Sequence, residues 1–282
     1  AITNIGSIGF EGTSTAANAT IDNAGLIDLY HSTTTADATI TNRGLLFYYS
    51  SSSAGSSTIT NTGGLDFRAD STASSATIAN ANYMSFAGNS TAGNATITNP
   101  GGITFTDSST AGDATITNTG GITFTSLASA GNANVTNTGT LVFDVSGTAG
   151  NATIANQSVM VFYRDSTAGT AGITNSSQLR FTDSSSAGGA AIINTGTLSF
   201  QSTSSAGTAV IVNTGSITFE DSSTAASATI VNHFDTVFED ASSAGGATIT
   251  NNGSLRFHGT SNAGSAAITN NAGGLVDFSG TL

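Results

Sequence analysis

The sequence predicts an all-β protein, a single-stranded parallel β-solenoid, and three observations predict it. An apolar residue recurs every 19 residues, and an asparagine always stands two residues after it. Around these positions small or apolar residues alternate with polar ones, which is typical of half-buried strands. Turn residues split each unit into two short strands, and no segment shows a helical apolar stripe. About fifteen such coils of 19 residues nearly exhaust the 282 residues of the chain.

The first expected strand of each coil carries the apolar residue and the asparagine. The apolar positions are Ile2, Ile21, Ile40, Ile59, Ile78, Ile97, Ile116, Val135, Ile154, Ile173, Ile192, Ile211, Ile230, Ile249 and Ile268. The asparagines run from Asn4 and Asn23 through Asn99, Asn118 and Asn137 to Asn270. Because a ligand site does not need fifteen identical copies, we expect a structural amide ladder along the solenoid.

The second expected strand carries a large side chain six residues after the asparagine. Most coils have a phenylalanine there, as in Phe105, Phe124 and Phe143, and the last coil reaches Phe278 after a two-residue insertion around 272–274. We expect these rings to form a stacked aromatic ladder. A single coil buries too few large side chains to offset its backbone entropy, so each coil depends on its neighbours.

Two turns complete each coil. The first contains glycine in many coils, namely Gly6, Gly25, Gly44, Gly63, Gly101, Gly120 and Gly139. We expect a positive φ at these glycines. The second turn has the form Ser-Thr-Ala-Gly-Asn, as at 90–94.

Composition excludes several functions. A net charge of −12 with five Arg and no Lys gives no basic surface for nucleic acid. The absence of cysteine excludes disulfides, zinc–thiolate sites and cysteine nucleophiles. We expect no cofactor. No apolar run would insert this segment into a membrane.

The chain is expected to be one continuous solenoid domain over 1–282. Its first residue already lies in a strand, and neither end shows a polar cap. We therefore expect a fragment of a longer repeat tract. The alternative is self-association through open solenoid ends, which would make the chain the subunit of an extracellular filament that stacks head to tail.

The unit STAGNATITNPGGITFTDS at 90–108, repeated with variations over the whole chain, resembles repeat tracts in the passenger regions of bacterial autotransporters. That resemblance implies a β-helical protein that is extracellular or at the bacterial cell surface. It also implies a role in adhesion or in presentation of another domain, with a host-surface protein or a carbohydrate as partner.

We therefore expect a non-enzymatic, extracellular structural rod, with two further alternatives. Thr-x-Thr pairs resemble the flat faces of ice-binding proteins, but other residues interrupt them. The pairs are Thr39/Thr41, Thr58/Thr60, Thr96/Thr98, Thr115/Thr117 and Thr248/Thr250, and the interruptions are Asp22, Ile193, Val210, Val212 and Val231. A polysaccharide-active enzyme on this fold builds its cleft from long loops, whereas nearly every coil here has 19 residues.

Two sets of outward residues are candidate sites. Glu220, Asp221, Glu239 and Asp240, with His258 next in the glutamate column, could hold a cation or perform acid–base chemistry. Asp107 and Asp183 fill the aspartate position in ordinary coils, so a solvated turn is the simpler interpretation and no metal is expected. The second set is outward aromatic residues, which could contact sugars or a partner protein or could be neutral variation: Tyr30, Phe47, Tyr49, Tyr163 and Phe234.

Overall fold

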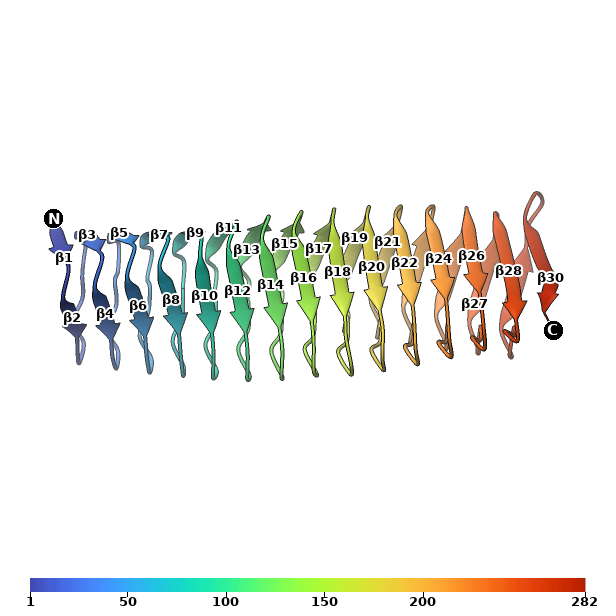
Figure 1. Cartoon of the computed structure of the whole chain (residues 1–282), viewed down its shortest axis with the longest axis horizontal. Coiled ribbons are helices and arrows are strands. Elements are labelled where there is room, and N and C mark those ends of the chain that lie inside the picture. Colours follow the sequence, from blue (N-terminus) through green and yellow to red (C-terminus); the bar gives the residue numbers. More distant parts are fainter. Residues whose placement is uncertain (282) are drawn as a thin grey trace. The chain divides into compact units, whose positions relative to one another are not determined.

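A computed structural model describes residues 1–281, and all its regular elements are strands. None of these residues lies in a helix, and so none lies in an apolar helix of membrane-spanning length. Contacts group the chain into two compact units, the first comprising Ala1–Thr140 and the second beginning at Leu141. Strand β16 (Thr140–Phe143) begins on the last residue of the first unit (Figure 1).

In the first unit the odd-numbered strands form one sheet and the even-numbered strands form another. The odd strands are β1 (Ile2–Asn4), β3 (Thr20–Asn23), β5 (Thr39–Asn42), β7 (Thr58–Asn61), β9 (Thr77–Asn80), β11 (Thr96–Asn99), β13 (Thr115–Asn118) and β15 (Asn134–Asn137). The even strands are β2 (Ser7–Phe10), β4 (Leu26–Leu29), β6 (Leu45–Tyr48), β8 (Gly64–Phe67), β10 (Tyr83–Phe86), β12 (Gly102–Phe105) and β14 (Gly121–Phe124).

The second unit repeats this arrangement. Its odd strands are β17 (Thr153–Asn156), β19 (Gly172–Asn175), β21 (Ala191–Asn194), β23 (Val210–Asn213), β25 (Thr229–Asn232), β27 (Thr248–Asn251) and β29 (Ala267–Asn270). Its even strands after β16 are β18 (Val159–Phe162), β20 (Gln178–Phe181), β22 (Thr197–Phe200), β24 (Ser216–Phe219), β26 (Asp235–Phe238), β28 (Ser254–Gly259) and β30 (Leu275–Thr281).

Strand pairing in both units is parallel and steps by one repeat. Ile97 pairs with Ile116 in one sheet, and Phe86 pairs with Phe105 in the other. A third line of single bridges joins the second turns, as between Thr91 and Thr110. The predicted fold class, an all-β parallel solenoid of about fifteen 19-residue coils, is confirmed.

From Ile21 to Phe257 each coil buries the same positions. Ile97 and Phe105 are at most 1% exposed, as are their equivalents along most of the chain. In the first unit the rings from Tyr48 to Phe124 stack with centroids 4.5–4.8 Å apart. In the second unit the rings from Phe143 to Phe278 stack with centroids 4.5–5.0 Å apart and interplanar angles of 4–8°. The in-register repeat therefore places one ring directly on the next.

Tyr48 brings a hydroxyl into the aromatic column, and Thr35 replaces the usual alanine opposite it. The Tyr48 hydroxyl lies 2.9 Å from Thr35 Oγ1, which itself donates to the carbonyl of Ala54 at 3.0 Å. Since the one proton of Thr35 is used in this way, Tyr48 donates to Thr35. Burial raises the pKa of the Tyr48 phenol, and the hydrogen bond to Thr35 lowers it in part.

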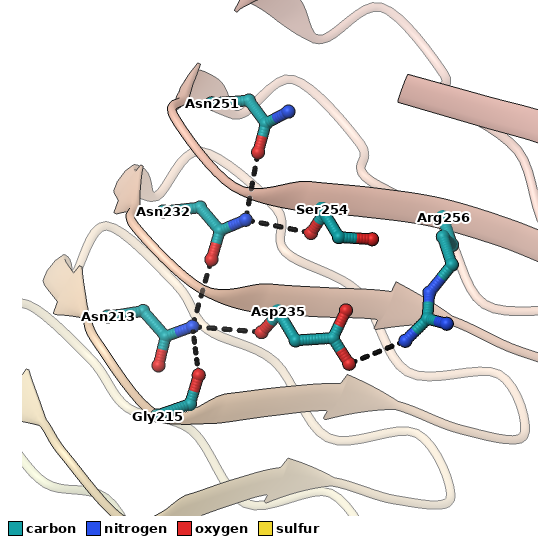
Figure 2. A network of polar contacts seen from close by, with 7 residues as sticks. All are labelled: Asn213, Gly215, Asn232, Asp235, Asn251, Ser254 and Arg256. Carbon is teal, nitrogen blue, oxygen red and sulfur yellow. Dashed lines mark hydrogen bonds and ion pairs between the residues drawn. The ribbon is translucent and has the colours of Figure 1, made fainter. Parts of the chain in front are cut away.

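The buried asparagines form a continuous amide chain within each unit. Each Nδ2 donates to Oδ1 of the asparagine one coil later at 2.7–2.8 Å through the first unit, from Asn4 to Asn137. In the second unit the same bonds run from Asn156 to Asn270 at 2.7–2.9 Å. Figure 2 shows three members, Asn213, Asn232 and Asn251. All these bonds point in the same direction along the chain.

The second proton of each amide also has an acceptor. Asn232 Nδ2 donates to the carbonyl of Ser254 at 2.8 Å, at the start of strand β28 in the next coil (Figure 2). Asn251 makes the same bond to Leu275 at 2.8 Å, although the chain between them is two residues longer. The insertion at 272–274 is thus absorbed in the turn. Because the amides are both buried and hydrogen-bonded, the column fixes the turn as well as the strand.

The prediction of positive φ at the first-turn glycines is wrong, because none of the seven has one. Most coils have glycine in the first turn because the preceding coil lies close, although Asn82, Ser158, Ser177 and Phe234 occupy the same position in four other coils. A Cβ on Gly120 would stand 2.0 Å from the carbonyl oxygen of Gly101, and Gly44 and Gly63 are equally close to their predecessors. Left-handed residues lie instead in two columns around the second turn. Gly93 and Asp107, with φ of 61° and 57°, are examples.

Replacement of Asn118 tests the amide ladder. Asn118→Ala deprives Asn99 Nδ2 of its acceptor in the ladder and Asn137 Oδ1 of its ladder donor. At about 1–3 kcal/mol for each buried group left unpaired, we expect a loss of about 2–6 kcal/mol in unfolding free energy. Chemical denaturation measures it. The control Asn94→Ala alters an exposed asparagine and should change stability by less than about 0.5 kcal/mol; equal losses in the two variants would contradict the ladder.

Two adjacent glycines test the close approach of coils. Gly120→Ala forces a Cβ against the Gly101 carbonyl, whereas a Cβ on Gly121 meets nothing within 4 Å. We expect Gly120→Ala to destabilise the protein by about 1–3 kcal/mol, as overpacking does. Gly121→Ala should be neutral or slightly stabilising. Melting temperatures by circular dichroism measure both, and a neutral Gly120→Ala would show that the coils can separate without cost.

Candidate contact sites on the outer face

The first unit gathers three of the predicted outward aromatic residues. Tyr30 and Tyr49 occupy the same position in consecutive coils, and their rings stack with centroids 4.9 Å apart and 6° between planes. The ring of Phe47, two residues before Tyr49, is tilted by 36° against the Tyr49 ring, with the two ring centroids 5.7 Å apart. The repeat brings these rings together because residues 19 apart are neighbours across the sheet.

Arg68 follows Tyr49 in the same column and covers the rings. Its guanidinium carbon lies 5.1 Å from the Phe47 ring centroid and 5.8 Å from that of Tyr49. Its Nη2 also forms an ion pair of 3.1 Å with Asp66, which accepts a hydrogen bond from Ser85. The guanidinium is thus held by cation–π contacts and by a carboxylate. We call Tyr30, Phe47, Tyr49 and Arg68 the aromatic cluster.

Partial burial changes the acidity of groups in and beside the aromatic cluster. It raises the pKa of the Tyr49 phenol, which Arg68 lowers and Asp28 raises in smaller measure. Burial also raises the pKa of the Asp28 carboxyl, on strand β4 directly beside Phe47 of β6. Leu45 and Tyr83, each nearly half exposed, lie on the same sheet. The cluster therefore lies in a partly dehydrated, apolar area of an otherwise Ser/Thr-rich face.

In the second unit Tyr163 borders a hollow of about 230 Å³, together with Asp144, Arg164 and Asp183. Arg164 Nη1 donates to both carboxylate oxygens of Asp144, at 2.9 and 2.8 Å. Arg180 lies against the Tyr163 ring, with its Nη2 3.3 Å from the phenol oxygen and its guanidinium carbon 6.0 Å from the ring centroid. The hollow combines one ring, two carboxylates and a guanidinium.

The predicted acidic set occupies turns. Asp221 Oδ2 accepts from the backbone N–H of Ser202 at 2.8 Å, and Asp240 Oδ2 accepts from that of Asp221 at 3.1 Å. Asp107 and Asp183 make the same bond to the preceding coil, at 3.0 Å each. An aspartate here thus caps a donor one coil away.

The neighbouring groups are separately engaged. Glu220 accepts from Gln201 Nε2 at 3.0 Å, while Glu239 and His258 continue the same column. Arg256 pairs with Asp235 at 2.6 Å rather than with the glutamates (Figure 2). Within residues 1–281 no three His, Cys, Asp or Glu side chains gather in a way that could hold a metal ion.

The Thr-x-Thr pairs lie on the outward face of the odd-numbered strands. In the first unit Thr58, Thr60, Thr96 and Thr98 are exposed, with Ala79 between them in the register. In the second unit Ile193 and Val210 are about half exposed on the corresponding strands β21 and β23. The threonine face is therefore interrupted as the sequence indicated.

Phe234 stands apart from the other aromatic candidates. It is 60% exposed in a first turn where glycine is usual, and it stacks on no other ring in the described chain. Two residues later Thr236 occupies a core position between Ile217 and Leu255, and its buried hydroxyl has no hydrogen-bond partner among residues 1–281. This coil departs from the repeat on both its inner and outer sides.

Sequence reasoning missed the charged partners of these rings. The signal was present for Arg68, because it follows Tyr30 and Tyr49 at the same 19-residue spacing. Arg164 and Asp144 are 20 residues apart, and Arg180 is 17 residues after Tyr163. These contacts run diagonally between coils and depend on side-chain rotamers, which the repeat does not specify.

No known family model matches the chain. Searches of curated proteins and of solved structures also returned no significant match. The chain's own residues are therefore the basis on which its function is inferred.

Thr236 allows a stabilising substitution. Thr236→Val replaces an unpaired buried hydroxyl with a methyl group of similar size, so we expect unfolding free energy to rise by about 1–3 kcal/mol. Thermal unfolding measures this. Thr218→Val is the control. Thr218 lies one coil earlier, on the half-buried outward position that pairs with Val237, and its replacement should have little effect. A lower melting temperature for Thr236→Val would mean that the hydroxyl has a partner.

Proposed function

We propose that the protein is a non-enzymatic, extracellular structural scaffold that acts by surface contact, in adhesion or in presentation of another domain. One observation carries the proposal. Most coils keep the same buried columns, while most of the large and charged side chains that depart from the repeat lie on the outer face. A scaffold that holds a constant core can vary its outer positions freely, and contact surfaces arise there.

The aromatic cluster has the composition of a contact surface. Aromatic and arginine side chains are enriched where proteins bind partners, because they offer a large contact area and lose little conformational freedom. Here the rings already stack on one another, and Arg68 is already paired with Asp66, so little further ordering is needed on binding. Equivalent positions in ordinary coils hold Thr104 and Thr106, which shows that folding does not require the rings.

Constant coil length also favours a scaffold over an enzyme. The described coils contain one insertion, of two residues at 272–274, so the outer face lacks the long loops with which enzymes on such folds surround a substrate. The cysteine-free, Ser/Thr-rich surface suits an oxidising, extracellular setting.

The test is adhesion of the full chain. Beads that carry the chain are applied to surfaces coated with a glycoprotein, with the same protein after removal of its glycans, or with albumin. We expect retention on at least one of the first two surfaces. The variant Phe47→Thr/Tyr49→Thr/Arg68→Ala, which takes threonines from ordinary coils, should lose most of it.

Leu127→Ser is the control, because Leu127 is exposed on another turn and Ser108 fills its place one coil earlier. It should leave retention unchanged. Absence of retention by the unmodified chain on every surface, or measurable cleavage of a polysaccharide by it, would contradict the proposal.

A further inference from the structure

The hollow beside Tyr163 exists because two neighbouring side chains diverge. Arg164 reaches back to Asp144 in the preceding coil, whereas Tyr163 reaches forward to Arg180 in the following coil. Asp183, one coil after Arg164, accepts a hydrogen bond from the Arg164 backbone N–H at 3.0 Å and completes the lining. The open space of about 230 Å³ is thus bordered by side chains that are each hydrogen-bonded to another residue of the chain.

The backbone at one wall of the hollow is unusual. Val145, next to Asp144, has φ of 40°, and Ser146 has φ of 37°. A β-branched residue rarely adopts this left-handed conformation. The surroundings hold it there, because Asp165 accepts hydrogen bonds from both the N–H and the hydroxyl of Ser146, at 2.9 and 2.7 Å. The left-handed φ of Val145 belongs to the column that runs through the second turns, as at Ser126 and Arg164, whereas the left-handed φ of Ser146 is specific to this coil.

The lining matches the chemistry of a sugar. An aromatic ring can pack against the apolar face of a pyranose, while its hydroxyls need both acceptors and donors. Asp144 and Asp183 supply carboxylate acceptors, and Arg164 supplies donors. At about 230 Å³ the hollow is smaller than the roughly 300–1,000 Å³ of pockets for drug-sized ligands, so it suits one ring.

Charge argues against other small ligands. Two carboxylates against one guanidinium line the hollow, and the whole chain carries −12, so an anionic group would be repelled. A metal ion is not favoured either, because residues 1–281 contain no cluster of three ligating side chains. A neutral, hydroxyl-rich ligand can bond to the lone pairs and N–H groups that these internal bonds leave over, without adding charge.

We propose that this hollow binds a single neutral hexopyranose unit of a glycan, with Tyr163 against the ring and Asp144, Arg164 and Asp183 bonded to its hydroxyls. The inference deepens the contact role proposed above, since it names the ligand class of one outer-face site. It concerns the second unit only and involves no residue of the aromatic cluster.

The test is saturation-transfer NMR with the full chain and four methyl glycosides, those of glucose, galactose, mannose and N-acetylglucosamine. We expect binding of at least one glycoside with a millimolar dissociation constant. Tyr163→Thr and Arg164→Ser, which introduce the residues of ordinary coils, should each weaken it at least tenfold while the circular dichroism spectrum is retained.

Gln201→Thr is the matched control, because Gln201 stands two coils after Tyr163 in the same column and does not line the hollow. It should bind as the unmodified chain does. The proposal is overturned if none of the four glycosides binds at 50 mM, or if Tyr163→Thr binds as well as the unmodified chain. If no glycoside binds but the beads are still retained on the deglycosylated protein, the sugar site is rejected and the proposed contact role is kept.

Discussion

The buried asparagine column is the interaction on which the rest of the structure depends. An amide has two donors on one side and an acceptor on the other, so it can bond to its copy in the next coil and to a turn carbonyl together. No charged residue could repeat at this spacing without repulsion, and no apolar residue could satisfy the turn. The same amide therefore sets the register between coils and the shape of the first turn.

Register in turn determines what lies inside and outside. Since equivalent residues are stacked within each unit, rings lie on rings at 4.5–5.0 Å and first-turn backbones approach until only glycine fits easily. The outer positions make no comparable demand, because Thr106, Tyr163 and Glu220 all occupy the same column. The protein can thus carry aromatic clusters, ion pairs and capped turns on a constant core.

The repeat allowed the strands, the two sheets and the inward columns to be predicted, because period and alternation depend on sequence order alone. The repeat did not predict correctly where the left-handed backbone lies. Gly120 lacks a Cβ that would clash with the Gly101 carbonyl, whereas positive φ occurs at residues such as Asp107, which the sequence does not mark. The repeat also gave the aromatic candidates without their partners Arg68 and Arg180. Arg68 continues the 19-residue spacing of Tyr30 and Tyr49, so the pattern did contain its position. The contact of Arg180 with Tyr163 depends on rotamers and on diagonal approach between coils, which a one-dimensional pattern does not contain.

Side-chain amide hydrogen exchange tests the central claim most directly. In ¹⁵N-labelled protein the Nδ2 protons of buried asparagines such as Asn99, Asn118 and Asn213 should exchange at least a hundredfold more slowly than those of exposed Asn94, because each is bonded and removed from water. Equal exchange of the two sets would show that the amide column is not formed, and that the coils are held in register by some other interaction.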